Sequence, residues 1–304
     1  MEANVLWGFP QIPHMLYTLA LTLGAQQVAV LGWAMGLLAV LGLSGHFADR
    51  FGDQLGWVAP AVLLSGTSLA ASLAWGYVDW PSILFGWMTL YGLDRYLQKE
   101  ELTWAILAGL GSGLALGSKY PAGLLLVSGA ATLLLLGRKK AKALLSFLAA
   151  AGLVALPWAL RNLLATGNGI YPMLFSGGVM DAFRLQATQA LPAQGNWLDL
   201  LLLPFRAVLF GLESGRVGGA PGYEADLGIA ILAFALFAWL DRQRLPAGEL
   251  TSLRLLALFS MMTIVVWVVA ARLSGHLVRT HLYYFAFPAF AGLAVLGFRN
   301  VSHL

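Results

Sequence analysis

The sequence has no cysteine and little charge. Among its 304 residues, 18 are Lys or Arg, 14 are Asp or Glu, and charged residues make up 11% of the chain. The missing cysteines exclude disulfides and thiol chemistry. A soluble domain carries about 25% charged residues, and the formal charge of +4 is too small for a nucleic-acid-binding surface. We therefore expect neither a soluble domain nor a nucleic-acid partner.

Apolar residues dominate the composition instead, at 59% of the chain. A domain of this length still exposes much of its surface, so one core cannot hide that many apolar side chains. Lipid is the solvent that accommodates them. The composition predicts an all-α, polytopic transmembrane helical bundle.

Long apolar runs give the expected number of membrane spans, since each crossing helix needs about 20 mostly apolar residues. Nine segments qualify: 26–44, 57–76, 79–97, 103–118, 120–137, 143–161, 224–241, 251–272 and 280–298. Residues 1–25 form an interfacial segment, with a short helix expected over 10–24. We expect one transmembrane domain over 1–304, with six spans in 26–161, a long loop at 162–223 and three spans in 224–298.

Basic residues predict the orientation, because Lys and Arg collect in short cytoplasmic loops. One set of alternate connections carries eleven cations: Arg50, Arg95, Lys99, Arg138, Lys139, Lys140, Lys142, Arg242, Arg244, Arg254 and Arg299. The opposite side carries seven: Lys119, Arg161, Arg184, Arg206, Arg216, Arg272 and Arg279. We expect the first set in the cytoplasm of a multi-pass cell-membrane protein, with the N-terminus and the loop 162–223 outside.

Glycines recur every four residues at Gly109, Gly113 and Gly117, just before Ser118 and Lys119. A phosphate-binding loop needs a different spacing and a preceding strand. Small residues at this interval are typical of close contact between membrane helices. The pattern therefore predicts helix packing.

Two charged residues lie in turns on the sparsely charged outer side. Asp79 in Tyr77-Val78-Asp79-Trp80-Pro81 has the composition of a helix N-cap, and an ionisable group at the membrane boundary is also often functional. Lys119 is either an anchor that extends its ammonium into the headgroups or a point charge for a lipid-linked phosphate. We favour the second role for Lys119, because its position opposes the general charge bias.

Further candidates flank the sixth and ninth spans. Arg161 and Asn162 end the sixth span, and Asn168 and Tyr171 follow in a Gly-Asn turn. Arg279 opens the last span. Each arginine is either an interfacial anchor or a phosphate ligand. The five histidines lack metal-ligand spacing, so we assign no metal and no cofactor, although a divalent metal stays an option.

In order, the chain shows Pro-Gln-x-Pro-x-Met-Leu-Tyr from Pro10, Tyr-x-Asp at Asp79, Ser-Lys-Tyr around Lys119, Pro-Trp-x-x-Arg-Asn…Thr-Gly-Asn-x-x-Tyr-Pro from Pro157 to Pro172, and Arg279 before the tyrosines of the last span. This series resembles the family C polytopic glycosyltransferases, in particular bacterial members of the protein mannosyltransferase and aminoarabinose transferase type. The resemblance covers nearly the whole chain.

The resemblance implies transfer of a sugar, with inversion, from a polyprenyl-phosphate carrier to an unknown acceptor on the outer face. Asp79 would be the catalytic or acceptor-side carboxylate. Lys119, Arg161 and Arg279 would hold the lipid phosphate, where positive charge stabilises the leaving group. Asn162, Asn168 and Tyr171 would belong to a loop motif of the family.

The resemblance also indicates a departure, since a first helix and an outer loop with a catalytic Asp precede the Pro-Gln-x-Pro segment in that family. Nine residues precede Pro10 here, so we expect an N-terminally truncated chain that is inactive by itself. Two alternatives stay open. One is a transporter or flippase for a lipid-linked substrate, which needs ionisable residues near the midplane, and the other is a non-catalytic scaffold.

Overall fold

The computed structural model describes residues 5–66, 78–189, 237–240, 242–274 and 287–302, with the single positions 70, 73, 198 and 234. Over these residues the ordered elements are helices: η1 Val5–Gly8, α1 Ile12–Thr22, α2 Ala29–Phe51, α3 Asp53–Gly56, α4 Val58–Leu63, α6 Asp79–Lys99, α7 Leu102–Leu116, η2 Tyr120–Ala122, α8 Gly123–Leu136, α9 Lys140–Thr166, α10 Ala182–Gln189, η3 Arg242–Arg244, α14 Ala247–Ser274 and α15 Phe287–Ser302. The expected all-helical membrane fold is confirmed.

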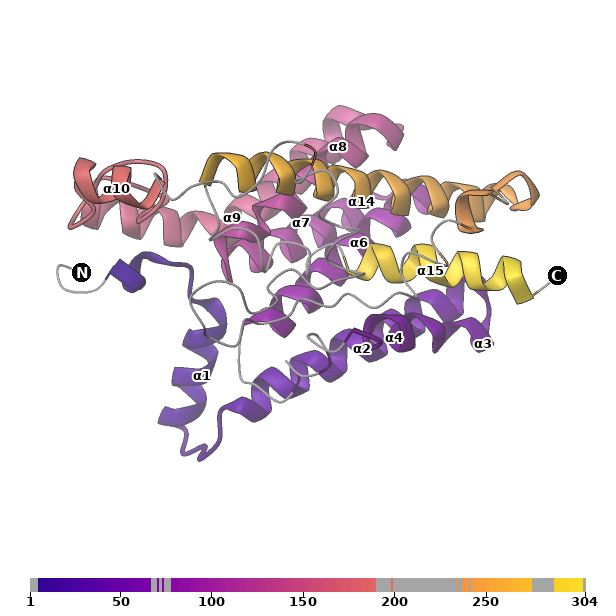
Figure 1. Cartoon of the computed structure of the whole chain (residues 1–304), viewed down its shortest axis with the longest axis horizontal. Coiled ribbons are helices and arrows are strands. Elements are labelled where there is room, and N and C mark those ends of the chain that lie inside the picture. Colours follow the sequence, from indigo (N-terminus) through magenta and orange to yellow (C-terminus); the bar gives the residue numbers. More distant parts are fainter. Residues whose placement is uncertain are drawn as a thin grey trace.

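The long helices α2 and α14 run lengthwise through the molecule, the shorter α15 lies along the same direction in one half, and α1 crosses that direction at the opposite end (Figure 1). Three described helices are long and apolar enough to cross a membrane: Ala29–Phe51, Lys140–Thr166 and Ala247–Val266. Shorter apolar helices cover Leu102–Leu116, Tyr120–Leu136 and Ala289–Arg299. The count of nine spans stays a prediction, because most of 224–241 and parts of 57–76 and 280–298 lie outside the described residues.

Glycines bring α7 against its neighbours, as the four-residue spacing predicted. A Cβ atom on Gly109 would collide with the Phe147 carbonyl of α9, and one on Gly113 would collide with Ala151. Gly117 receives the Ile12 side chain of α1 in the same way. The packing prediction is confirmed, because close backbone approach leaves no space for a larger side chain.

Helix α2 is longer than predicted. The apolar run ends near residue 44, yet the helix continues to Phe51 and buries His46 at 4% exposure. The helix extends beyond the predicted span because His46 and Arg50 of its last two turns are largely shielded from solvent. They face a carboxylate on α6.

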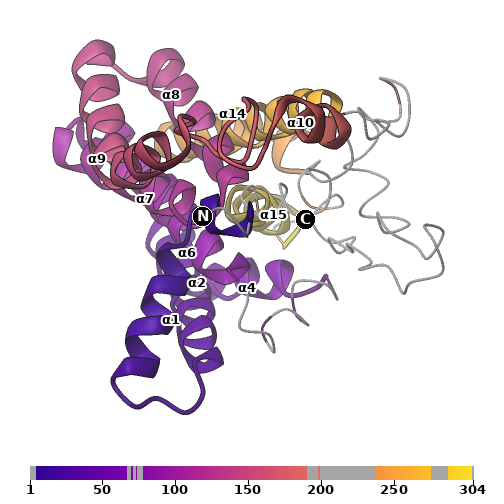
Figure 2. The same cartoon turned by 90° about the vertical axis from the view of Figure 1, so that its left-hand side faces the viewer.

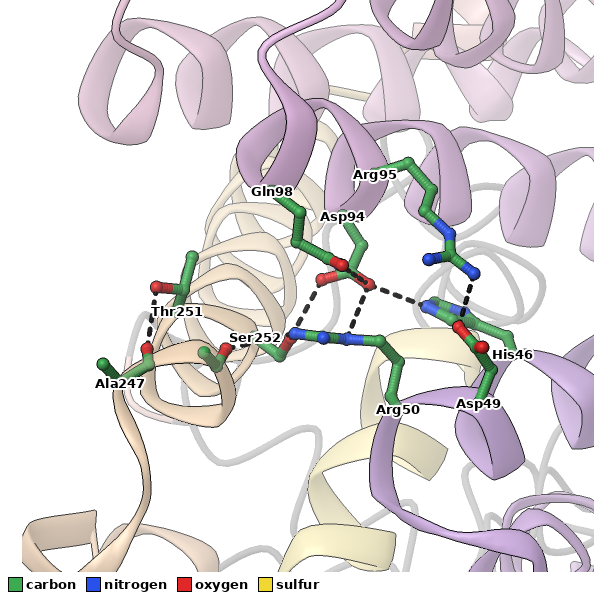
Figure 3. Close-up of polar contacts among 10 residues, drawn as sticks. His46, Asp49, Arg50, Asp94, Arg95, Gln98, Ala247, Thr251 and Ser252 are labelled. Atoms are coloured by element: carbon green, nitrogen blue, oxygen red, sulfur yellow. Dashed lines mark hydrogen bonds and ion pairs between the residues drawn. The ribbon is translucent and has the colours of Figure 1, made fainter.

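That carboxylate is Asp94, which is 2% exposed and central to a polar network joining three helices (Figure 3). Its Oδ2 lies 3.1 Å from Nε2 of His46 and 3.1 Å from Nε of Arg50, both on α2. Ser252 of α14 donates to Oδ1 at 2.9 Å, and Gln98 donates to Oδ2 at 2.6 Å. Three hydrogen bonds, from His46, Gln98 and Ser252, and an ion pair with Arg50 therefore surround one buried carboxylate.

The network extends to the neighbouring helices at the same end. The Arg50 guanidinium also donates to the Gly248 carbonyl at 3.1 Å, at the start of α14. Glu249 of α14 pairs with Arg299 of α15. Hence α2, α6, α14 and α15 are fastened together at what we call the Asp94 end of the bundle.

We predict that Asp94→Asn lowers the free energy of unfolding by about 3–5 kcal/mol, because it leaves Arg50 buried without its counter-charge. Denaturant unfolding in detergent micelles measures the change. The matched control is Asp49→Asn, since Asp49 is 54% exposed in its pair with Arg95 and should cost at most about 1 kcal/mol. Equal costs for the two variants would contradict a stabilising role for the network.

Candidate functional site

The other end of the bundle holds the residues that the sequence singled out. Asp79 begins α6, and Asp94 lies fifteen residues further along the same helix, a distance of about 22 Å at 1.5 Å per residue. Lys119 follows α7 in extended conformation, just before η2. We call this the Asp79 end.

An ion pair joins two of the predicted site residues across forty positions of sequence. Lys119 Nζ donates to Asp79 Oδ1 at 2.9 Å. The Asp79 side chain is 11% exposed and the Lys119 side chain 25% exposed, so the pair is partly shielded from solvent. Two side chains proposed for one site are therefore in direct contact.

The pair also corrects the predicted capping role of Asp79. Val78 is the N-cap of α6, and Asp79 is the first helical residue, with no capping hydrogen bond from a side chain. The carboxylate accepts a bond from the Lys119 ammonium instead. Lys119 in turn is not a free anchor in the headgroups.

Tyr17 on α1 is a neighbour of this pair that the sequence analysis left without a role. Its side chain is buried at 8% exposure. Burial first, and the Asp79 carboxylate second, raise the pKa of Tyr17 above its ordinary value. The phenol therefore keeps its proton and adds a neutral hydroxyl close to the charged pair.

Helix α1 is held in place through main-chain carbonyls just before it. The Gly8 carbonyl accepts from Asn162 Nδ2 at 2.7 Å, from Tyr120 OH at 3.1 Å and from Trp158 Nε1 at 3.1 Å. The Ile12 amide donates to the Gly117 carbonyl at 3.0 Å. We call the donors Tyr120, Trp158 and Asn162 the Gly8 cradle.

The cradle also reaches the loop after α9. Tyr120 OH, which shares its single proton between the Gly8 and Tyr171 carbonyls, lies 3.0 Å from the Tyr171 oxygen, and Asn162 Nδ2 lies 3.3 Å from the same oxygen. The Tyr171 ring is fully buried and occupies the space that a side chain at Gly8 would need. Asn162 is fully buried as well, so its amide is a cross-link between segments and not a surface group.

Asn168 shapes the same loop. Its Nδ2 donates to the Met173 and Phe175 carbonyls at 3.0 and 2.7 Å, and its Oδ1 accepts from the Ile170 amide at 3.0 Å. All of the loop-motif residues named from the sequence are thus buried. Asn162 and Asn168 form hydrogen bonds through their side chains, whereas Tyr171 accepts them through its main-chain carbonyl. Their contacts order the chain around the site.

Arg161 lies beside the cradle. Its guanidinium stacks over the Trp158 ring at 4.4 Å and donates to the Trp7 carbonyl at 3.0 Å. Asn162 Nδ2 donates to Tyr120 OH at 3.0 Å. This bond joins the residue after Arg161 to the residue after Lys119. Whether the two cations share one phosphate stays a prediction, and Arg279 lies outside the described residues.

The sequence analysis gave no role to Gly8, Tyr17, Tyr120 or Trp158. Three of them stood inside the quoted motifs, since Tyr17 closes the first, Tyr120 follows Lys119 and Trp158 follows Pro157. The motifs therefore pointed to this part of the chain. They could not show that Tyr120 and Trp158 donate hydrogen bonds to a main-chain carbonyl that is distant in sequence.

Within the part of the chain that the structure describes, no three His, Asp or Glu side chains gather in a geometry that could hold a metal ion. The Oδ1 atom of Asp79 is engaged by Lys119.

The apolar helices form the bundle of a polytopic membrane protein, with the Lys119–Asp79 ion pair at one end. The family model for dolichyl-phosphate-mannose-protein mannosyltransferase matches residues 12–163, which contain Asp79, Lys119 and Arg161. The chain belongs to this family, which confirms the resemblance drawn from the motifs. Comparison with curated protein sequences found no match.

Two solved structures share the fold. ArnT from Cupriavidus metallidurans in the apo state has a TM-score of 0.61 and 12% identity. The same protein bound to undecaprenyl phosphate has a TM-score of 0.62 and 13% identity. Each match covers 98% of this chain and 50% of ArnT, so the chain spans half of the length of that protein.

We predict that Asn162→Ala releases the segment before α1, because the Gly8 carbonyl loses its shortest bond. The chain has no native cysteine, so a Phe9→Cys substitution provides a single reporter. Thiol labelling at position 9 should be about tenfold faster in the Asn162→Ala background, from the loss of roughly 1–2 kcal/mol of hydrogen bonding.

The matched control is Gln98→Ala, which removes an amide at the Asp94 end and should leave labelling at position 9 unchanged. Equal labelling rates in both backgrounds would show that the cradle does not hold this segment.

Proposed function

We propose that the chain is a membrane glycosyltransferase component that binds a sugar carried on polyprenyl phosphate at the Asp79 end. The observation that carries the proposal is the ion pair of Lys119 with Asp79. Family membership supports the reaction class, and undecaprenyl phosphate is bound by ArnT, which shares the fold. The sugar carrier is thus a lipid with a phosphate headgroup.

Lys119 is suited to the phosphate. An ammonium has three donors, and the Asp79 bond uses one of them. A carrier phosphate would take the remaining donors, so the cation would be shared between carboxylate and phosphate. Charge-assisted bonds of this kind are stronger than neutral ones, and they stabilise the phosphate as it leaves.

Asp79 is suited to the acceptor. Lys119 engages Oδ1, and Oδ2 has no hydrogen-bond partner among the described residues. In the proposed transfer, the acceptor hydroxyl gives its proton to this oxygen and its own oxygen forms a bond to C1 of the sugar. The bond between C1 and the phosphate oxygen breaks, and the lipid phosphate departs beside Lys119. A positioned carboxylate within reach of the nucleophile is the usual general base.

We propose that Tyr17 and Arg161 also belong to the site. The protonated Tyr17 phenol supplies a neutral donor for a sugar or phosphate oxygen. Arg161 adds positive charge near the cradle, and a guanidinium binds phosphate bidentately. We propose that both contact the carrier, with Lys119 as the principal cation.

The orientation proposed from the basic residues places the Asp79 end outside the cell membrane. We predict that single cysteines at Lys140 and Gln243 are shielded from an impermeant thiol reagent in intact cells. A cysteine at Phe175, which is 64% exposed at the Asp79 end, should be labelled. Labelling at position 140 and protection at 175 would reverse the topology.

We predict different effects for the two members of the ion pair on binding of undecaprenyl phosphate to the purified chain. Lys119→Met should weaken binding by roughly tenfold to a hundredfold, since one charge-assisted contact contributes about 1.5–3 kcal/mol. Asp79→Asn should not weaken it, because the substitution removes a carboxylate that competes with the phosphate for Lys119.

Arg242→Ala is the control, since Arg242 precedes α14 at the Asp94 end and stacks over Trp239. If the ion pair were purely structural, both substitutions would weaken binding alike. That outcome would refute the proposed phosphate site.

A further inference from the structure

A second charged surface lies at the Asp94 end, in the short turn between α8 and α9. Four of the five residues from 138 to 142 are cations, and all four are exposed: Arg138, Lys139, Lys140 and Lys142. Arg138 pairs with Glu100 at 2.8 Å. The ammonium groups of the three lysines have no ion-pair partner among the described residues, and no acidic residue stands in the first turn of α9.

An apolar surface begins directly beside these lysines. Leu135 near the end of α8 is 60% exposed, and Leu145 one turn into α9 is 71% exposed. Further along α9, the exposed leucines continue at helical spacing with Leu148, Leu153, Leu156, Leu160, Leu163 and Leu164. Helices α8 and α9 lie at the edge of the bundle (Figure 2), so this stripe faces outward.

The most apolar 18-residue window of α9 is 22% buried, against 39% for the corresponding windows of α2 and α14. An uncovered apolar stripe that ends in uncompensated positive charge is complementary to a molecule with an apolar tail and an anionic head. Basic clusters next to a membrane helix attract acidic phospholipids. The charge favours an anionic lipid over a zwitterionic one, because a neutral headgroup gains little from three ammonium groups.

We propose that Lys139, Lys140 and Lys142, with the exposed leucines of α8 and α9, form a binding surface for an anionic glycerophospholipid. The phosphate of the headgroup contacts the lysines, and the acyl chains lie along the leucines. The leucine stripe runs along α9 toward the Asp79 end, but the headgroup site at the lysines is separate from the Asp79–Lys119 pair, since the lysines lie at the opposite end of the helices. Its occupancy therefore does not depend on the proposed transferase activity.

The test is native mass spectrometry of the purified chain with dioleoyl phosphatidylglycerol and dioleoyl phosphatidylcholine. The unaltered chain should prefer the anionic lipid, and the preference should decline as salt screens the charges. Replacing all three lysines with Gln should reduce the preference by roughly tenfold to a hundredfold. Replacing all three with Arg should retain it, as should Arg254→Gln, a change of an exposed cation on α14.

Glycerol 3-phosphate, which has the phosphate without the tails, separates a lipid surface from a simple phosphate site. It should displace phosphatidylglycerol weakly at equal concentration. Equal binding of the two lipids by the unaltered chain, an unchanged preference in a folded Gln variant, or full displacement by glycerol 3-phosphate would each overturn the proposal. If the Gln variant does not fold, the salt dependence of the unaltered chain decides.

Discussion

The ion pair between Lys119 and Asp79 is the interaction on which the account of the Asp79 end depends. A single charge at the edge of a hydrocarbon layer is costly, whereas a pair at 2.9 Å compensates both charges. The pair also connects the turn after α7 to the first residue of α6. Two residues that are forty positions apart in sequence are therefore in direct contact. Because Asp79 already holds the Lys119 ammonium in place, an incoming phosphate would only need to share this ammonium, and the lysine side chain would not have to move.

The Gly8 cradle gives this pair a defined surrounding. Its buried Asn162 amide joins main-chain carbonyls before α1 and after α9, and α1 in turn carries Tyr17 beside Asp79. These bonds fix the path of the main chain, because the acceptors are main-chain carbonyls. They do not depend on the side chains of the residues that carry those carbonyls. The Asp94 network performs the corresponding task at the other end, so the helices are fastened at both ends.

Much of the fold could be predicted from sequence, because apolar runs and the Gly109, Gly113 and Gly117 spacing report directly on lipid burial and close packing. Asp79 and Lys119 could be singled out, but their contact could not, since each also fits an ordinary local role as a cap or an anchor. Asp94 was missed because it stands beside Arg95 near the end of a predicted span, where charges are normally solvated. Only the packing of α2 and α14 against α6 shows that its carboxylate is buried.

The most direct test of the central claim is an experimental structure of this chain with undecaprenyl phosphate. The account predicts phosphate oxygens within about 3 Å of Lys119 Nζ, a charge-assisted hydrogen-bond distance, with Asp79 still beside the ammonium. A phosphate bound elsewhere, with the Lys119–Asp79 pair intact and remote from it, would contradict the account.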